Sequence, residues 1–94
     1  MIDVASVVKL ASKARLRFDR HRQQHMLLYP ERGIVLSATA ADIVALLTEA
    51  RTVGSIVEQL SEKYGQARRE EIARDVLELL RDLAARGLVA ELTP

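Results

Sequence analysis

The segment KARLRFDRHRQQHMLLYPERGIVLS, residues 13–37, decides the fold of this 94-residue chain. Its first part alternates charged side chains with Leu16 and Phe18, which is the period-two pattern of a half-buried strand. Two short apolar runs follow, at residues 26–29 and 34–36, and each is bounded by polar or turn-forming residues. We therefore predict three antiparallel strands, joined as a meander, within this segment.

The sequence Pro30-Glu31-Arg32-Gly33 separates the two apolar runs. A proline early and a glycine last are typical of a hairpin loop built on a type I turn. We expect Gly33 to adopt the left-handed backbone conformation at the end of this loop.

After Ser37 the apolar residues recur at helical spacing. Ser37 or Thr39 can cap a first helix, Thr52 or Ser55 can cap a second, and Gly87 ends a third. The predicted helices cover residues 39–50, 52–64 and 68–86, and Leu88–Leu92 is predicted as a short strand or an extended tail.

These elements indicate an α+β fold, winged helix-turn-helix-like, in which a three-stranded antiparallel sheet is followed by three helices. Residues 13–94 are expected to form this single domain, and residues 1–12 an N-terminal arm.

The composition narrows the classes of function. The chain has no cysteine, which excludes disulfides, thiolate metal sites and thiol catalysis. No run approaches the roughly 20 apolar residues of a membrane span. The stretch Ile2–Ala11 also lacks the basic start and the long apolar centre of a secretory signal. We expect a cytoplasmic protein with no membrane partner.

Charge is unevenly distributed along the chain, although the net charge is only +1. Residues 1–32 carry seven Lys or Arg against three Asp or Glu, a balance of +4, so the remaining residues carry −3. This asymmetry indicates either a solvated strand face or an acidic partner near the first third of the chain.

No catalytic, metal or cofactor site is visible in the sequence. His21 and His25 are four residues apart, but they flank a predicted turn, and only Asp19 is nearby as a third ligand. The four glycines each occupy a predicted turn or cap, and they do not form a phosphate-binding loop. We therefore expect surface histidines and a protein that is not an enzyme.

A winged helix suggests DNA binding, but the charge of the third predicted helix argues against it. Residues 68–86 carry five arginines and five carboxylates, so this helix is neutral and its acids would face phosphates. We expect no nucleic-acid partner and keep a DNA-binding winged-helix transcriptional regulator as the alternative function.

The third predicted helix has a wider apolar face than a small core requires. At about 100° per residue its apolar positions form two adjoining stripes, which together span about 160°. The core stripe is Ile72, Val76, Leu79 and Leu83, and the second stripe is Ala73, Leu77, Leu80 and Ala84. If the third strand is a sheet edge, the second stripe would be a shelf beside it, and the two would form a groove for an extended peptide. The alternative is that both stripes pack on the sheet and the first helix.

Three segments carry a more specific signal. They are Leu-Leu-Tyr-Pro-Glu-Arg-Gly at 27–33, Leu-Ser-Ala-Thr-Ala-Ala-Asp-Ile at 36–43, and Arg-Thr-Val-x-x-Ile-Val at 51–57. Together they closely resemble the PqqD family, the peptide chaperones of pyrroloquinoline quinone biosynthesis. The resemblance covers nearly the whole chain from about residue 13. The chain departs from the family at residues 48–50, where Thr-Glu-Ala replaces a Cys-Asp-Gly-like turn, a change that would lengthen the first helix.

The resemblance implies a domain that binds the leader of a PqqA-like precursor peptide as an added strand between the third strand and the third helix. Such domains present the peptide to a PqqE-like radical S-adenosylmethionine enzyme, and the iron–sulfur chemistry belongs to that partner, so no cofactor is expected here. Carried over, the peptide would contact Gly33, Ile34, Val35, Leu36, Ser37, Ala73, Leu77, Leu80, Arg81 and Ala84. Arg69 is a further candidate to meet peptide carboxylates. An open edge can also pair with a second copy of the chain, so a homodimer or a pure oligomerisation module is another alternative.

Overall fold

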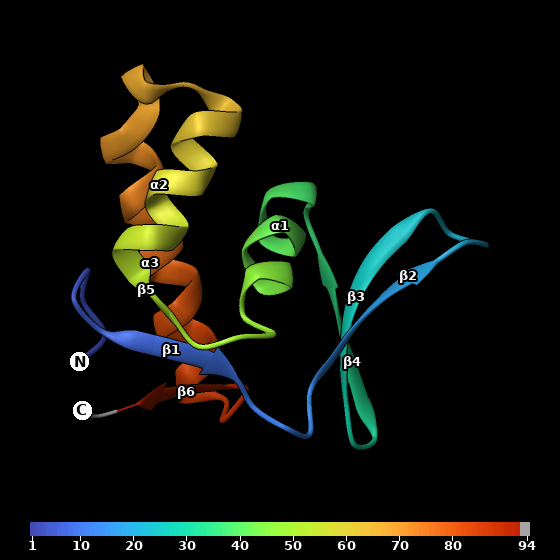
Figure 1. Cartoon of the computed structure of the whole chain (residues 1–94). Coiled ribbons are helices and arrows are strands. Elements are labelled where there is room, and N and C mark those ends of the chain that lie inside the picture. Colours follow the sequence, from blue (N-terminus) through green and yellow to red (C-terminus); the bar gives the residue numbers. More distant parts are fainter. Residues whose placement is uncertain (93–94) are drawn as a thin grey trace.

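The structure consists of two small sheets and three α-helices. The computed structural model describes residues 1–92. Its elements are β1 (Val7–Leu10), β2 (Arg15–Asp19), β3 (Gln24–Tyr29), β4 (Arg32–Leu36), α1 (Ala38–Leu46), β5 (Arg51–Thr52), α2 (Val53–Tyr64), a 3₁₀ turn (Gln66–Arg68), α3 (Arg69–Ala85) and β6 (Val89–Leu92). Helices α2 and α3 lie side by side, β1, β5 and β6 lie near one end of this pair, and α1 lies between the pair and the sheet β2–β3–β4 (Figure 1).

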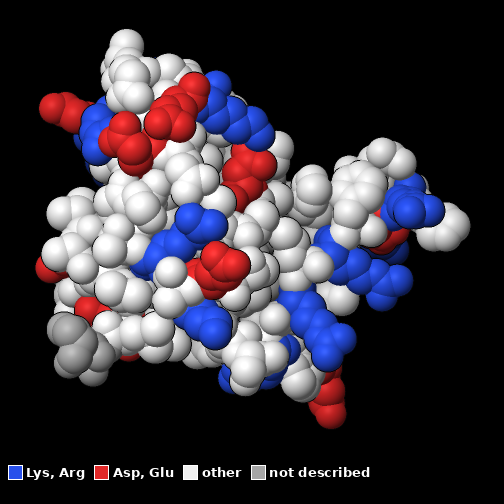
Figure 2. Space-filling view, viewed as in Figure 1, with Lys and Arg blue, Asp and Glu red and all other residues white. Residues whose placement is uncertain are grey.

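The predicted meander is confirmed, and its strands are β2, β3 and β4. Leu16 lies opposite Leu27, and Leu27 lies opposite Ile34, so these three residues share one face of the sheet and pack on the core. Arg15 and Arg17 alternate with them and are exposed on the other face. Lys and Arg side chains gather on the hairpins of this sheet (Figure 2), so the excess positive charge of the first third lies on solvent-facing surface.

The turn between β3 and β4 differs from the prediction. Tyr29 pairs with Arg32, so only Pro30 and Glu31 form the loop. Glu31 has the positive φ, 68°, whereas Gly33 lies inside β4 and has no positive φ. The prediction of a left-handed Gly33 is therefore wrong. A two-residue loop that begins with proline needs its positive φ at the next residue, as in a type II turn.

Residues 1–12 do not form a separate arm, because β1 is the central strand of the second sheet. The order of this sheet is β5–β1–β6, and Val7 pairs with Thr52 on one side and with Leu92 on the other. Val8 is fully buried in the core. A four-residue strand has little local signal of its own, so partners far along the chain determine that it forms. The same sheet confirms residues 89–92 as a strand.

Side-chain caps determine where two helices begin. The N–H of Ala40 donates to Oγ of Ser37 at 3.1 Å, and the N–H of Ser55 donates to Oγ1 of Thr52 at 3.1 Å. Both caps were among the predicted ones. Helix α1 ends at Leu46, earlier than predicted, and a turn at residues 47–50 leads from it into β5.

The core lies between the helices and the two sheets. Helix α3 contributes the buried stripe Ile72, Val76, Leu80 and Leu83, and α2 packs along it. Within residues 1–92, no helix is both long enough and apolar enough to span a membrane.

Candidate functional site

Strand β4 is an edge of the sheet β2–β3–β4. Within residues 1–92 it pairs only with β3, and the C-terminal strand β6 pairs with β1 instead. Residues of an antiparallel ladder alternate between those bonded to the partner strand and those whose backbone groups face away from it. Tyr29 and Arg32 close a two-residue hairpin and so form a bonded pair. The N–H and C=O groups of Gly33 and Val35 therefore face outwards, where an additional strand can pair with them.

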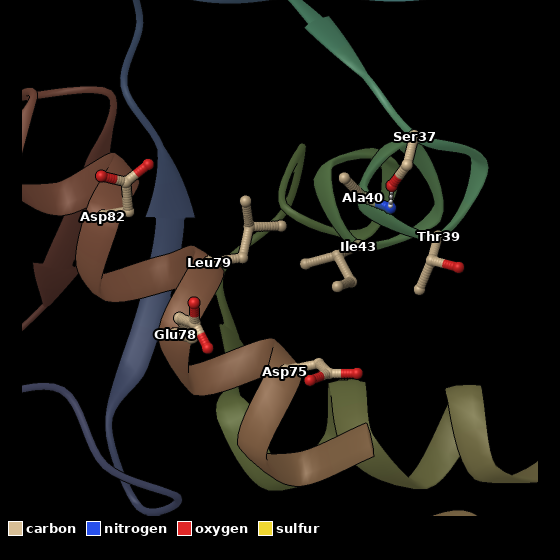
Figure 3. A pocket seen from close by; sticks show the side chains of 8 residues that line it. All are labelled: Ser37, Thr39, Ala40, Ile43, Asp75, Glu78, Leu79 and Asp82. Carbon is tan, nitrogen blue, oxygen red and sulfur yellow. Dashed lines mark hydrogen bonds between the residues drawn. The ribbon is translucent and has the colours of Figure 1, made fainter. Parts of the chain in front are cut away.

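A groove of about 540 Å³ lies between the end of β4, the start of α1 and one flank of α3. Its lining residues are Ser37, Thr39, Ala40, Ile43, Asp75, Glu78, Leu79 and Asp82. Ile43 and Leu79 point toward each other from the two walls, whereas the three carboxylates lie along α3 (Figure 3). The groove thus combines an apolar centre with one acidic wall.

The sheet edge and the groove form one continuous surface. Ser37 joins β4 directly to α1, and its extended backbone, with φ −66° and ψ 165°, prolongs the strand. Its side chain caps the helix, as described above, and also lines the groove. A strand added to β4 would therefore run toward the groove without an intervening loop.

A smaller hollow of about 130 Å³ continues the groove toward the start of α3. It shares Thr39, Ile43 and Asp75 with the groove and adds Tyr64 and Arg68. The surface available to a ligand therefore extends from the groove to the end of α2.

Asp42 links α1 to the end of α2 beside this hollow. Its Oδ2 accepts hydrogen bonds from the hydroxyl of Tyr64 and, at 2.9 Å, from the ammonium group of Lys63. The bond from Tyr64 is the larger cause, followed by that from Lys63, and together they hold the pKa of Asp42 below its ordinary value. This link holds the α1 wall of the groove against the helix pair.

The strand residues predicted from the sequence lie at this edge. Val35 has an exposed side chain, with 55% of its surface accessible, and Gly33 is also exposed. Ile34 is half-buried and Leu36 is buried, so only their backbones are near the edge. Ser37 contributes to the groove.

The helix residues predicted from the sequence lie on the opposite flank of α3 from the groove. At about 100° per residue the predicted shelf borders the buried stripe on one side, and the groove residues border it on the other. The shelf residues are Ala73, Leu77, Leu80 and Ala84, and the groove residues are Asp75, Glu78, Leu79 and Asp82. Leu80 has no exposed surface, and the other three shelf residues are half-buried against the core. The structure therefore does not bring the shelf into the groove.

The N-terminal segment lies against the shelf flank. Nε of Arg81 donates a hydrogen bond to the carbonyl oxygen of Ile2 at 3.0 Å. Arg81 and Ala84 line a separate hollow together with Met1 and Ile2. Residues 1–12 were expected to form a separate arm, so the contact of Met1 and Ile2 with this flank was not predicted. Arg69, the other basic candidate, forms an ion pair with Glu58.

Seven groove residues besides Ser37 were not predicted as site residues. They are Thr39, Ala40 and Ile43 of α1 and Asp75, Glu78, Leu79 and Asp82 of α3. Leu79 carries a signal in the sequence that could have identified the groove. It was predicted to belong to the core stripe, but three carboxylates, Asp75, Glu78 and Asp82, border it on the helix. A half-buried leucine on an acidic flank indicates an apolar surface that solvent still reaches.

The histidines take no part in this site. The ring of His25 stacks at a tilt on Phe18, with 4.8 Å between the ring centroids, and His21 is exposed in the β2–β3 turn. In the described part of the chain, no three His, Cys, Asp or Glu side chains are grouped so that they could hold a metal ion.

Comparison with known proteins assigns the family. Residues 24–89 match the family model described as coenzyme PQQ synthesis protein D (PqqD). The chain is 41% identical over 90 residues to the PqqA binding protein of Rhodopseudomonas palustris strain BisB5, which covers 96% of this chain and 87% of the relative. It is 37% identical over 84 residues to the PqqA binding protein of Gluconobacter oxydans strain 621H, which covers 89% of this chain and 86% of the relative.

Two solved structures share the fold. One is the solution structure of the PqqD truncation of Methylobacterium extorquens PqqCD, described as a functional, stand-alone recognition element for ribosomally synthesised and post-translationally modified peptides. Its TM-score is 0.82 at 32% identity, with 96% of this chain and 95% of that chain covered. The other is TbiB1 in complex with the TbiA(beta) leader peptide, with a TM-score of 0.74 at 23% identity and 92% of this chain and 99% of that chain covered. The second likeness concerns the fold alone. The match over residues 24–89 and the identity to the curated relatives show that this chain belongs to the PqqD family.

Proposed function

We propose that this protein binds a PqqA-like precursor peptide as a strand added to β4 and presents it to a PqqE-like radical S-adenosylmethionine enzyme. The observation that carries the proposal is the outward-facing backbone of β4, which leads directly into the groove between α1 and α3. Strand addition of this kind derives its affinity from main-chain hydrogen bonds and its specificity from side-chain pockets beside the edge.

The family relatives support this choice of ligand. Curated members at 37–41% identity are named for binding PqqA, and the Methylobacterium extorquens neighbour is described as a recognition element for modified ribosomal peptides. Since such peptides are made by the ribosome, the encounter is expected in the cytoplasm. The protein itself is proposed to be a carrier rather than an enzyme, with the radical chemistry supplied by its partner.

The proposed site keeps the strand residues predicted from the sequence and replaces the helix residues. The peptide backbone would pair with the segment Gly33–Ser37. Its side chains would enter the groove beside Ile43 and Leu79, in place of the predicted shelf on the other flank of α3.

The expected affinity suits a protein that hands its ligand on. Four ladder hydrogen bonds contribute about 0.5–1.5 kcal/mol each, and two buried apolar anchors contribute about 1.5–3 kcal/mol each. Ordering the peptide and restricting its free motion cost at least about 4 kcal/mol. The middle of these ranges leaves about 4.5 kcal/mol, a roughly millimolar dissociation constant, and the upper limit of about 8 kcal/mol corresponds to a micromolar one.

The proposal predicts that Val35→Pro weakens peptide binding. Proline removes the outward amide of an edge residue, and its ring obstructs an approaching strand, whereas the bonds to β3 come from the neighbouring residues. Isothermal titration calorimetry with the synthetic PqqA peptide of Rhodopseudomonas palustris strain BisB5 should show binding weaker by about fivefold or more, as expected for one lost hydrogen bond and a clash.

Val35→Ala is the matched control, because it shortens the same side chain but keeps the amide. Circular dichroism would verify that both variants are folded. If Val35→Pro is folded and binds as tightly as the wild type, the added strand is not at β4. Peptides N-methylated at alternate residues test the same ladder without changing the protein, and unchanged binding by every one of them would reject strand addition.

A further inference from the structure

The charges of α3 are segregated by flank, although residues 68–86 are neutral overall. Four of its carboxylates recur at spacings of four, three and four residues, which places them along one flank at 3.6 residues per turn. These residues are Glu71, Asp75, Glu78 and Asp82. Arg74 and Arg81 lie away from this line, and Arg81 is bonded to the N-terminal segment. The flank that faces the groove is therefore the acidic one.

No basic side chain lines the groove itself. Its charged residues are Asp75, Glu78 and Asp82, and the opposite wall contributes only the hydroxyls of Ser37 and Thr39. Asp82 lies 3.4 Å from Nε of Arg86, but within residues 1–92 neither Asp75 nor Glu78 forms an ion pair. These two carboxylates at the edge of an apolar groove thus form no ion pair in the described chain, although Arg68 lines the adjoining hollow together with Asp75.

The acidic wall is long enough for two same-face side chains of a strand. Residues 75 and 82 are separated along the helix axis by about 10 Å, at 1.5 Å per residue. Side chains on one face of a strand recur about every 6.6–6.8 Å. A strand lying beside α3 would therefore present two successive same-face side chains, at positions i and i+2, to this wall.

We propose that the groove selects a precursor segment carrying Lys or Arg at two alternate positions, i and i+2, which face Asp75 and Glu78 of α3. The proposal rests on the proposed function and names the chemistry that the site recognises. Asp75 and Glu78 are about 4.5 Å apart along the helix axis, which is closer than two same-face side chains of a strand, so side chains that reach both must be long enough to converge. Lys and Arg suit such a groove because their methylene stems pack on apolar surface while their charged ends reach the carboxylates. Ile43 and Leu79 provide that apolar surface, and an acidic segment would be repelled from the same wall.

Calorimetry with the synthetic PqqA peptide of Rhodopseudomonas palustris strain BisB5 tests the proposal. The double variant Asp75→Asn/Glu78→Gln keeps side-chain shape and removes two charges, so binding at low salt should weaken about two- to fivefold for each carboxylate. The double variant Glu62→Gln/Glu70→Gln, with exposed residues outside the groove, changes the net charge equally and should bind as the wild type does. Raised salt should weaken the wild type more than the groove variant.

Peptide variants locate the partner charges. Replacing each Lys or Arg of the peptide by norleucine should weaken binding only at two positions separated by one residue. A charge swap combines Glu78→Lys in the protein with a Glu in place of the basic residue at one of those peptide positions. The combination should restore part of the affinity that either change alone removes. Wild-type protein that binds the peptide equally well after all its Lys and Arg are replaced overturns the charge proposal and leaves strand addition intact. Wild-type protein that does not bind the unmodified peptide at all contradicts the proposed function itself.

Discussion

Glu31 occupies a backbone conformation that costs free energy for any residue except glycine. Its φ of 68° in the two-residue turn between β3 and β4 is in the left-handed region, which costs an L-residue with a side chain about 1–2 kcal/mol. Glycine removes this cost but loses more chain entropy on folding, by about 0.4–1 kcal/mol. We predict that Glu31→Gly raises the free energy of unfolding by about 0.5–1 kcal/mol.

Urea denaturation followed by circular dichroism would measure this gain. Glu31→Ala has the same loss of charge without the backbone freedom, so it should not be more stable than the wild type. A glycine variant no more stable than the alanine variant would show that the turn is not strained in solution.

Gly33 has an ordinary strand conformation, and its missing side chain leaves room for the ends of two neighbouring side chains. A Cβ atom at this position would lie 2.9 Å from Cδ2 of Leu28 and 3.2 Å from Cε of Met26. These two side chains lie over the glycine on the outer face of the sheet. The predicted left-handed conformation of Gly33 was wrong, because the sequence alone does not show whether a glycine serves backbone conformation or close packing.

At the scale of elements, the link from Asp42 to Lys63 and Tyr64 makes the packing of α1 on α2 dependent on pH. Because the folded state lowers the pKa of Asp42, this contribution is present above the unfolded value of 3.8 and is lost as the pH falls below it. We predict that Asp42→Asn lowers the free energy of unfolding by about 0.5–1 kcal/mol at about pH 7. The difference from the wild type should disappear as the pH is lowered through about 4 to about 2.

Guanidinium or urea titrations over this pH range would test the link. Tyr64→Phe removes the stronger of the two hydrogen bonds and should reproduce part of the effect with the same pH dependence. A stability difference between wild type and Asp42→Asn that persists unchanged at the lowest pH would mean that the charge of Asp42 is not responsible.

The elements themselves were predictable because their signals are local. Alternation identified β2, and Ser37 and Thr52 marked the starts of α1 and α2 within a few residues of each cap. The open flank of α3 was not predictable in this way. The N-terminal segment occupies the other flank through the contact between Ile2 and Arg81, and this leaves the groove flank open. The two residues are 79 positions apart, and neither one alone indicates the other.

At the scale of the whole molecule, β1 joins the first residues of the chain to the last. Val8 on this strand is fully buried, whereas Val4, four residues earlier, is 55% exposed. We predict that Val8→Ala lowers the free energy of unfolding by about 2–3 kcal/mol, from the lost methyl groups and the cavity that remains. Val4→Ala should change it by less than about 0.5 kcal/mol.

Thermal and chemical denaturation of the two alanine variants would measure this contrast. Equal free energies of unfolding for both variants would show that residues 1–12 lie outside the folded domain. The sequence could not predict β1, because its pairing partners Thr52 and Leu92 are brought to it only by the complete fold. The difference between the Val8 and Val4 variants is informative for the same reason.

The antiparallel pairing of β1 with β6 has a consequence for how the protein can be joined to others. Val7 lies opposite Leu92, so the two ends of the described chain emerge close together, on the side of the molecule away from β4 (Figure 1). A second polypeptide joined to either end would leave the open edge at β4 unobstructed. This geometry suits a module that can be used alone or built into a longer chain.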